Sequence, residues 1–274
     1  MTTGTKGMLT TPTRRERQRA ATYDEIVTVA RHLLGEPEAL SLRAIAAEMG
    51  LTAPALYRYV DSYHELLMLV ARAIFEDVIS AMASARDRYG EDDPAAQILA
   101  SSVAFRGWAL SNPAEFGLIF ANAATAKPAE TSEATEPIDL SDQGGGAQFA
   151  EFFTDIFLRL WDRYQFPVPA DSDLDPTLLE LLSEQRSCGT LPCDLPGHPV
   201  GLSWIFIRCW ARLYGTVTLE VFKHMDHGMI QSGALFRSML EDNGRDLGFG
   251  DDQPRLSALT ELEMARWHGV RMDR

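Results

Sequence analysis

The chain has 274 residues, a formal net charge of −14 and three cysteines. This length allows a small domain beside a larger one, and three cysteines are too few for a disulfide-stapled fold, which fits a reducing compartment. No apolar run approaches the roughly 18 residues of a membrane span, and residues 1–13 lack the apolar core of a signal peptide. We therefore expect a cytoplasmic protein with no membrane partner.

The N-terminal segment is rich in arginine, with Arg14, Arg15, Arg17 and Arg19 close together. We expect residues 1–20 to form a disordered basic arm that becomes ordered on a phosphate backbone or in a minor groove. The rest of the charge is uneven, because the first 60 residues carry a net charge of +2 and the remaining residues carry −16. A mildly basic head on an acidic body favours nucleic acid as the partner of one end.

The most informative segment is SLRAIAAEMGLTAPALYRYV, which contains two short helical patterns joined by a turn. Apolar residues recur at i, i+3, i+4 and i+7 from Leu42 to Met49, which marks one face of a helix. Ser41 is placed to cap that helix, and Gly50 stands where a left-handed residue usually ends one. Thr52 is expected to cap the second helix, and Pro54 suits its first turn.

The outward face of the second helix is difficult to explain as packing. A buried helix would not present Tyr57, Arg58 and Tyr59 in succession, and a merely solvated face would more usually carry Glu and Lys. Short side chains near its start let the backbone approach base edges, while Tyr and Arg reach phosphates or bases. The alternative is an ordinary helical hairpin inside an all-α core. Ser62 and Glu65 then predict a capping box for the next helix.

The flanking helices complete the pattern. An apolar stripe precedes it in a helix that starts near Thr22, and another follows it from Leu66 onward. Over roughly residues 21–75 the chain resembles the N-terminal domain of the TetR family of transcriptional regulators. The segments that carry this resemblance are YDEIVTVARHLLGE, SLRAIAAEMGLTAPALYRYV and DSYHELLMLVARAIFEDV. The family usually has His where Tyr59 stands, and a phosphate-contacting Lys where Tyr63 stands. Tyr63 can donate one hydrogen bond but brings no charge, and His64 is a partial substitute.

The resemblance implies a face that reads DNA. Base or groove contact is expected from Pro54, Ala55, Tyr57 and Arg58. Phosphate contact is expected from Ser41, Arg43, Thr52, Tyr59 and Tyr63, and the predicted set is completed by Ala53 and His64. The sequence therefore predicts a helix-turn-helix DNA-binding domain over residues 21–66.

The body is also helical in pattern, and no strand-like alternation appears, so we expect an all-α fold. Residues 67–243 are expected to form a helical effector-binding and dimerisation domain. Within it, residues 125–148 are rich in Thr, Ala, Glu, Ser and Gly and predict a mobile loop. The last residues, 244–274, are expected to form a C-terminal extension with a short helix near residues 256–267. Helices are predicted near residues 67–89, 95–110, 113–124, 149–166, 177–185, 200–225 and 232–243.

Two stretches of the body look like the C-terminal domain of TetR regulators: N-P-x-x-F-x-x-I-F from Asn112 to Phe120, and W-x-x-L-Y-G-x-x-x-L-E from Trp210 to Glu220. This similarity implies a homodimer in which two late helices of each subunit form a four-helix bundle. A central helix of a monomer is the alternative. The candidate interface residues are Trp210, Tyr214, Val217, Val221, Phe236 and Leu240.

The body has many large aromatic residues, and most such residues belong to a plain core. A ligand cavity between helices would draw on the same set. If Arg106, Arg208, Arg212 or Gln185 faced inward, it would select an anionic or carbonyl-bearing ligand. The candidate pocket residues are Phe105, Trp108, Phe116, Phe120, Phe153, Phe157, Trp161, Trp204 and Arg208.

The chain lacks the motifs of the common catalytic sites: a Gly-rich phosphate loop, a nucleophile elbow and H-E-x-x-H. Cys188, Cys193 and His198 are spaced too irregularly for a zinc site. We therefore expect no enzyme activity, metal or cofactor. The favoured function is a repressor that binds a palindromic operator as a homodimer and is released by a small molecule. The alternatives are an activator or architectural DNA binder without an effector, and an all-α small-molecule binder or enzyme that does not bind DNA.

Overall fold

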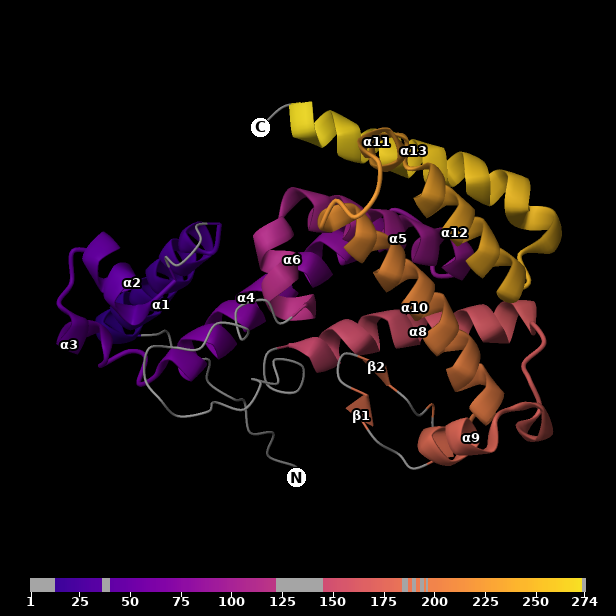
Figure 1. The fold of residues 1–274 in the computed structure, drawn as a ribbon, viewed down its shortest axis with the longest axis horizontal. Coiled ribbons are helices and arrows are strands. Elements are labelled where there is room, and N and C mark those ends of the chain that lie inside the picture. The colour runs from indigo at the N-terminus through magenta and orange to yellow at the C-terminus, as the bar shows by residue number, and fades with distance from the viewer. Residues whose placement is uncertain are drawn as a thin grey trace, which may run out of the picture. The chain divides into compact units, whose positions relative to one another are not determined.

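The structure is a computed structural model, and it describes residues 13–35, 40–121, 145–183, 187–188, 191–192, 195 and 197–272. The described residues are predominantly helical, which confirms the all-α prediction (Figure 1). The chain divides into two compact units, residues 1–70 and residues 71–274. None of the helices in the described ranges combines the length and the hydropathy that a membrane span requires.

The first unit contains three helices and the start of a fourth. They are α1 (Arg14–Leu33), α2 (Leu42–Glu48), α3 (Ala53–Leu56) and the first residues of α4 (Tyr63–Arg86). Each contributes apolar side chains to one small core, in which Ile26, Ile45, Leu56, Val60 and Leu66 are completely buried. These are the positions that the helical periodicity places inward, so burial of the periodic stripes holds this unit together.

The start of α1 differs from the prediction. Thr13 caps the helix, since its hydroxyl accepts a hydrogen bond from the Glu16 amide at 3.3 Å and the Glu16 carboxylate accepts one from the Thr13 amide at 2.6 Å. This reciprocal pair is a capping box, and Arg, Glu, Gln and Ala beyond it are good helix formers. The predicted start near Thr22 is therefore wrong, and so is the disordered arm from residue 14 onward. Residues 1–12 lie outside the described part of the chain.

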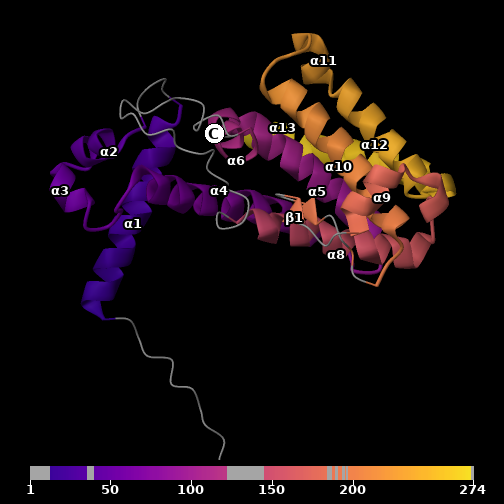
Figure 2. The ribbon, with the colours of Figure 1, turned by 60° about the horizontal axis from the view of Figure 1, so that its bottom comes forward.

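The second unit packs its helices around α5 (Pro94–Ser111), which is buried on nearly all sides (Figure 2). Helices α8, α10 and α13 lie against it. The other elements, besides the end of α4, are α6 (Pro113–Phe120), α8 (Gly146–Tyr164), α9 (Pro176–Ser183), α10 (Val200–Val221), α11 (His227–Ser232), α12 (Ala234–Asp246) and α13 (Gln253–Met272), with short 3-10 turns at Asp171–Asp173 and Gly250–Asp252.

Two segments of the body were predicted differently. A two-residue antiparallel pair, β1 (Ser187–Cys188) with β2 (Leu191–Pro192), interrupts the helical pattern and leaves the fold class unchanged. The predicted loop at residues 125–148 lies outside the described residues up to residue 144. Its last three residues belong to α8, because Gly145 adopts a left-handed conformation and starts the helix there.

The C-terminal extension is an integral part of the second unit. Its helix α13 has 20 residues and lies along α5 (Figures 1 and 2). The completely buried carboxylate of Glu263 accepts a hydrogen bond from the Tyr89 hydroxyl at 2.6 Å and pairs with Arg88 at the end of α4. Arg255, nearer the start of α13, pairs with Asp93 at 2.6 Å. The expected short helix at 256–267 was therefore too short, and the extension is anchored near the start and in the middle of α13.

Candidate DNA interface and body cavity

The turn between α2 and α3 has the geometry that the sequence predicts. The hydroxyl of Ser41 accepts a hydrogen bond from the amide of Ala44 at 3.1 Å, which confirms it as the cap of α2. Gly50 has φ +65°, and the amide of Leu51 donates to the carbonyl of Ala46 at 2.8 Å. This is the Schellman arrangement, in which a left-handed residue lets the last carbonyls of a helix find donors. The chain can therefore reverse within a few residues and begin α3.

Helix α3 is shorter than its sequence pattern suggests. Thr52 occupies the N-cap position, but its side chain makes no capping hydrogen bond, so the predicted cap is absent. Pro54 lies in the first turn as expected. After Leu56 the chain continues as a tight turn, with the Tyr59 amide donating to the Leu56 carbonyl at 2.8 Å. Pro54 and the residues of this turn are consequently carried on a short, tightly bonded segment.

Most of the predicted DNA-contact residues lie at the surface. Tyr57 is the most informative of them, because 47% of this large aromatic residue is exposed. The exposed members of the set are Arg43, Thr52, Pro54, Tyr57, Arg58 and His64, and the half-buried members are Ser41, Ala53, Ala55, Tyr59 and Tyr63. The first unit thus presents polar, aromatic and cationic groups around one helix-turn-helix, as a DNA-contacting surface requires.

Tyr59 and Tyr63 differ from the family pattern, and the structure shows their surroundings. The ring of Tyr59 meets the ring of Tyr23 edge to face at 5.7 Å, and the Tyr23 hydroxyl donates to the Tyr59 carbonyl at 3.1 Å. Tyr59 thus ties the turn to α1. Burial raises the pKa of Tyr63, so its hydroxyl keeps its proton and can donate a hydrogen bond. The phosphate contacts predicted for both tyrosines stay predictions.

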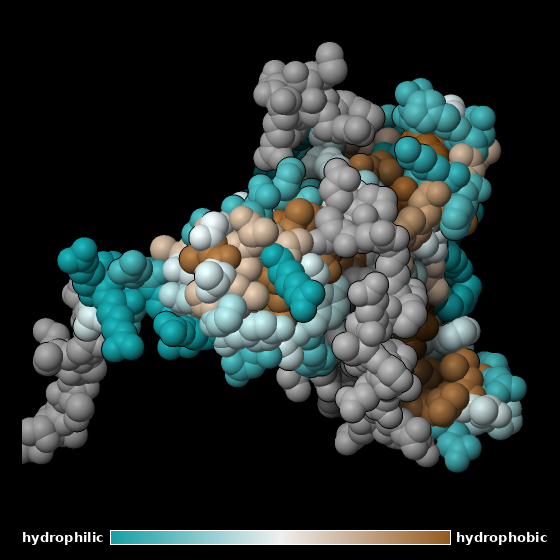
Figure 3. All heavy atoms as spheres, turned by 60° about the vertical axis from the view of Figure 1, so that its left-hand side comes forward, coloured by the Kyte–Doolittle hydropathy of each residue, from teal (hydrophilic) through white to brown (hydrophobic). Residues whose placement is uncertain are grey.

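The arginines expected in a flexible arm are held on the first turns of α1. Arg14, Arg15, Arg17 and Arg19 are all exposed there, and Figure 3 shows the start of α1 as a strongly hydrophilic part of the surface. The guanidinium of Arg19 donates to the Tyr23 hydroxyl at 3.1 Å. Since Tyr23 in turn holds Tyr59, a chain of contacts runs from this basic helix end to the turn after α3.

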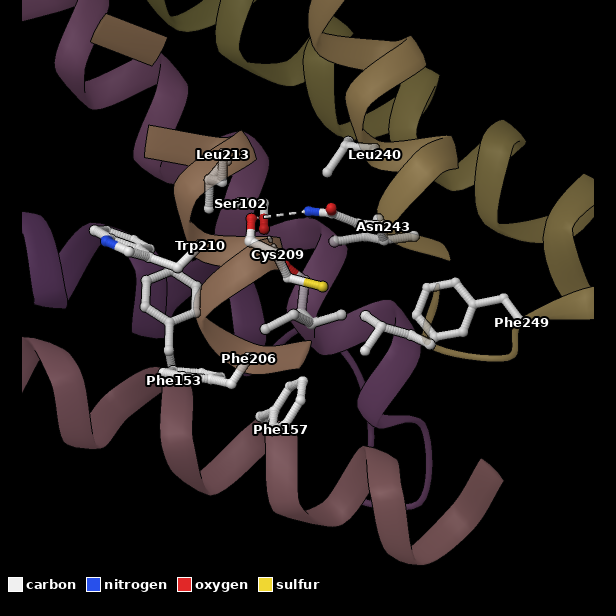
Figure 4. Close-up of a pocket in the computed structure, with 13 residues that line it drawn as sticks. Ser102, Phe153, Phe157, Phe206, Cys209, Trp210, Leu213, Leu240, Asn243 and Phe249 are labelled. Carbon is white, nitrogen blue, oxygen red and sulfur yellow. Dashed lines mark hydrogen bonds between the residues drawn. The ribbon is translucent and has the colours of Figure 1, made fainter. Parts of the chain in front are cut away.

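The body contains an apolar cavity between α5, α8, α10 and α12, closed by the segment that leads into α13 (Figure 4). The space that the centre of a water molecule can reach is about 50 Å³. Its wall is formed by Ile98, Leu99, Ser102, Phe153, Phe157, Phe206, Cys209, Trp210, Leu213, Leu240, Asn243, Leu247 and Phe249. An apolar, aromatic-lined cavity between helices is the usual form of a small-molecule site.

Only part of the predicted pocket lines this cavity. Phe153 and Phe157 do so. Phe105, Phe116 and Phe120 pack against one another beside the cavity without lining it, with the ring centroids of Phe116 and Phe120 5.0 Å apart and that of Phe105 5.8 Å from Trp210 in the cavity wall. The remaining predicted residues, Trp108, Trp161, Trp204 and Arg208, are not among the lining residues.

Some of the missed lining residues come from segments to which the sequence analysis assigns another role. Trp210 and Leu240 had been predicted as interface residues, and Phe249 lies in the segment that had been read as an extension. A large aromatic between two glycines, Gly248 and Gly250, was the available sequence signal.

The arginines near the cavity form ion pairs with acidic side chains of the same unit. Arg208 and Arg212 both pair with Asp246, at 3.3 and 2.7 Å, and Arg212 also donates to the side-chain oxygen of Asn243 at 3.0 Å. Arg106 is buried and makes two hydrogen bonds to Glu220, at 2.6 and 3.2 Å. The expectation that Arg106, Arg208 or Arg212 selects an anionic ligand is therefore not supported by this geometry. Gln185 lies outside the described residues.

The predicted dimer interface requires correction, since its side chains are used within one chain. Five of the six are buried in the second unit: Trp210, Val217, Val221, Phe236 and Leu240. The sixth, Tyr214, is half-buried, and its hydroxyl donates to the Phe120 carbonyl at 2.8 Å. Helix α10 is apolar nearly all round, and α5, α9 and α12 cover much of it within the same chain.

The cysteines and histidines of the described residues do not form a recognisable metal site. Among them no group of three or more His, Cys, Asp or Glu side chains is arranged to hold a metal ion. The side chains of Cys188 and Cys193 lie outside the described part, and His198 meets Trp161 edge to face at 5.6 Å. Cys209 is a free thiol in the cavity wall, and burial raises its pKa to about 12.

The chain combines a helix-turn-helix unit with an all-helical unit that has an internal cavity. This is the architecture of a one-component DNA-binding regulator. The family description "Tetracyclin repressor-like, C-terminal domain" matches residues 98–243. The chain therefore belongs to the TetR family and is a TetR-like DNA-binding regulator of transcription.

Individual relatives agree with this assignment. The chain is 29% identical over 201 residues to the HTH-type transcriptional regulator Rv1816 of Mycobacterium tuberculosis and to Mb1846 of Mycobacterium bovis, covering 72% of this chain and 79% of each relative. The crystal structure of SCO4313, described as a regulatory protein, matches with a TM-score of 0.57 and 24% identity, over 84% of this chain and 98% of that chain. That structural likeness supports the fold alone.

Proposed function

We propose that this regulator is a repressor that binds a palindromic operator as a homodimer and is released by a small molecule held in the body cavity. The observation that carries the proposal is the exposed group around the capped α2–α3 turn, where Arg43, Pro54, Tyr57 and Arg58 all reach solvent. Two such units on a twofold axis match two half-sites about one helical turn of DNA apart.

The arginines of the turn are assigned to different contacts, so they can be tested separately. Arg43 is assigned to a phosphate, and its replacement by Ala should weaken binding to all sequences and reduce the dependence of log K on log salt by about 0.9. Arg58 is assigned to the bases or groove, and Arg58→Ala should remove about 1–3 kcal/mol of discrimination between sequences. An exposed arginine outside the first unit, Arg72, supplies the matched control variant.

The experiment is a gel shift at several salt concentrations on DNA selected from a random pool. Variants at Arg43 and Arg58 are compared with Arg72→Ala, which should behave as the wild type. Equal losses in all three variants would mean that general charge, and not the helix-turn-helix, carries the binding. Selected DNA without twofold symmetry would argue against the homodimer on a palindrome.

The effector role is tested on the same protein–DNA complex. A ligand can release DNA only if it binds the free and DNA-bound states with different affinity. Compounds that stabilise the protein against heat are therefore added to the gel shift, and release is expected for those that occupy the cavity. A ligand that binds without changing DNA affinity would favour an activator or architectural protein.

For the homodimer we propose a face of α10 other than the residues predicted from sequence. Ile207, Ala211, Gly215, Leu219 and Phe222 follow one another at helical spacing, and Leu219 and Phe222 are 40% and 36% exposed. A side chain placed on Gly215 would meet no atom within 4 Å. An apolar stripe with small residues at its centre lets the same helix of a second copy approach closely, as twofold symmetry requires.

This face is tested by the oligomeric state in solution. Leu219→Glu is expected to convert a dimer to a monomer in light scattering after gel filtration, because it places a charge within the proposed interface. Leu262→Glu is the control, since Leu262 lies on α13 and is 51% exposed. A dimer that survives Leu219→Glu would place the interface elsewhere.

A further inference from the structure

We infer that Phe249 is a gate residue, and that the molecule admitted behind it is uncharged and largely apolar. This inference rests on the effector role proposed above, and it names the chemical class of the effector and the residue that controls its access. Phe249 is suited to the role because it lies in the wall between two spaces, the apolar cavity and a second one between α12 and α13.

The second space is larger and more polar. Its accessible volume is about 280 Å³, and Arg237, Glu241 and Glu261 stand among its lining residues. Among the described residues, only Leu99, Leu240 and Phe249 line both spaces, and all three are buried. These three side chains are therefore the partition, and a solute that moves from the polar space to the apolar cavity must pass them.

Size shows why the partition has to move. An apolar cavity of about 150 Å³ binds benzene, whereas the apolar cavity here offers about 50 Å³. Together the two spaces reach the lower end of the usual size of ligand pockets, about 300 Å³. A ligand that occupies the apolar cavity therefore needs the partition to open, so that the two spaces merge.

Of the three partition residues, Phe249 has the backbone best suited to move. Leu99 and Leu240 lie inside helices, whereas Phe249 lies in the connection between α12 and α13. Its neighbours Gly248 and Gly250 both have positive φ, +70° and +44°. A glycine on each side of Phe249 lets this segment change its dihedral angles at little cost. In Figure 4 the ring of Phe249 enters the cavity on the side opposite Trp210.

The polar side chains of the cavity wall bear on the ligand class, because Ser102 and Asn243 are already hydrogen-bonded within the protein. The Ser102 hydroxyl donates to the Ile98 carbonyl at 2.8 Å. The Asn243 amide donates to the Cys209 carbonyl at 3.1 Å, and its oxygen accepts from Arg212. The Cys209 thiol keeps its proton because burial raises its pKa to about 12. A charged group that entered the apolar cavity would therefore lose its hydration without gaining a partner, which is costly, and an uncharged apolar group would not.

The test uses three probes with one ring system and different charge: 2-naphthol, 2-naphthoate and the 2-naphthylmethylammonium ion. Their dissociation constants at pH 7 are measured by calorimetry without DNA. In the wild type, 2-naphthol is expected to bind at least about tenfold tighter than either ion. Phe249→Ala is expected to tighten 2-naphthol binding by about tenfold, because the protein no longer has to open the gate. Phe152→Ala is the control, since Phe152 is buried on α8 but does not line the cavity.

Two results would overturn the inference: an ion that binds as tightly as 2-naphthol, or Phe249→Ala binding no tighter than Phe152→Ala. If Phe249→Ala does not fold by circular dichroism, Phe249→Leu retains apolar bulk and should give a smaller tightening; no tightening in that folded variant counts equally against the gate. Because these measurements contain no DNA, the gate can fail while the repressor proposal stands. Conversely, gated binding that leaves DNA affinity unchanged would refute only the effector role.

Discussion

The completely buried carboxylate of Glu263 makes a sharp prediction, because three side chains converge on it. It accepts hydrogen bonds from Arg88, Tyr89 and Arg266, and so joins α13 to the end of α4. Burial opposes its ionisation, but the hydrogen bonds from Arg88 and Tyr89 outweigh that effect and hold the pKa of Glu263 below its ordinary value. Loss of the negative charge should therefore destabilise the second unit.

The size of the effect follows from the exposure of the partners. Breaking a fully buried ion pair costs about 3–5 kcal/mol, largely because a buried charge is left unpaired. In Glu263→Gln the remaining charges belong to Arg88 and Arg266, whose side chains are 36% and 46% exposed and can be hydrated. We therefore expect a loss of about 2 kcal/mol, the value of hydrogen bonds to a charged group. For a unit of this size the melting temperature should fall by about 4–8 °C.

Thermal unfolding at pH 7, followed by circular dichroism, measures this loss. Glu261→Gln is the matched control on the same helix, because Glu261 pairs with Arg237 but is 60% exposed, and it should lose less than about 0.5 kcal/mol. Since the folded pKa of Glu263 is depressed, its contribution is present above the ordinary carboxyl pKa of about 4.3 and is lost as the pH falls through the folded value. Equal stability of the two variants at pH 7 would refute the reasoning.

Three further predictions concern other parts of the chain. Arg106→Met should destabilise the second unit by about 3–5 kcal/mol in urea unfolding, because it leaves the buried carboxylate of Glu220 without its partner, and a second change, Glu220→Met, should restore part of the loss. With the other two cysteines replaced by serine, Cys209 should react with a thiol reagent at pH 8 at least about a hundredfold more slowly than free cysteine, and rapid reaction in the folded protein would contradict its burial. Gly50→Ala should lower the stability of the first unit by about 1–2 kcal/mol, because φ there is +65°, which is unfavourable for a residue with a Cβ. The loss comes from the backbone conformation alone, since the added Cβ would have no atom within 4 Å to clash with.

The first unit was predictable because its signals are local. Ser41, Gly50 and the apolar periodicity each act within a few residues, and the structure has the expected cap and left-handed turn. The start of α1 was missed for the opposite reason: its first turns are polar on all sides, so periodicity gives no signal there. The only indication was Thr13 followed three residues later by Glu16, which is the sequence form of a capping box.

The cavity was less predictable because it depends on which helices become neighbours. An aromatic side chain at the right helical spacing can face a cavity, a core cluster or a partner chain, and its spacing is the same in all three. Phe153 and Phe120 illustrate this, since both were expected in the pocket and only Phe153 lines it. Trp210 was assigned to the dimer seam and lies in the cavity wall. Choosing among these outcomes requires the packing order of the helices, which no local pattern encodes.

The role of the C-terminal helix nevertheless follows from a feature of α5 that is visible in its sequence. SSVAFRGWAL contains small and apolar residues on every face, and a helix of that kind must be covered on all sides. In the structure α8 and α10 cover part of α5, and α13 covers another part, where the ring of Trp267 lies so close to Gly107 that an added Cβ would be only 2.4 Å from it. The family match ends at residue 243, so the partner that α5 needs on this side comes from beyond it. The extension is therefore required by the composition of α5, and its connection to α12 also contains Phe249, which places the proposed gate between the cavity and the helix that completes the fold.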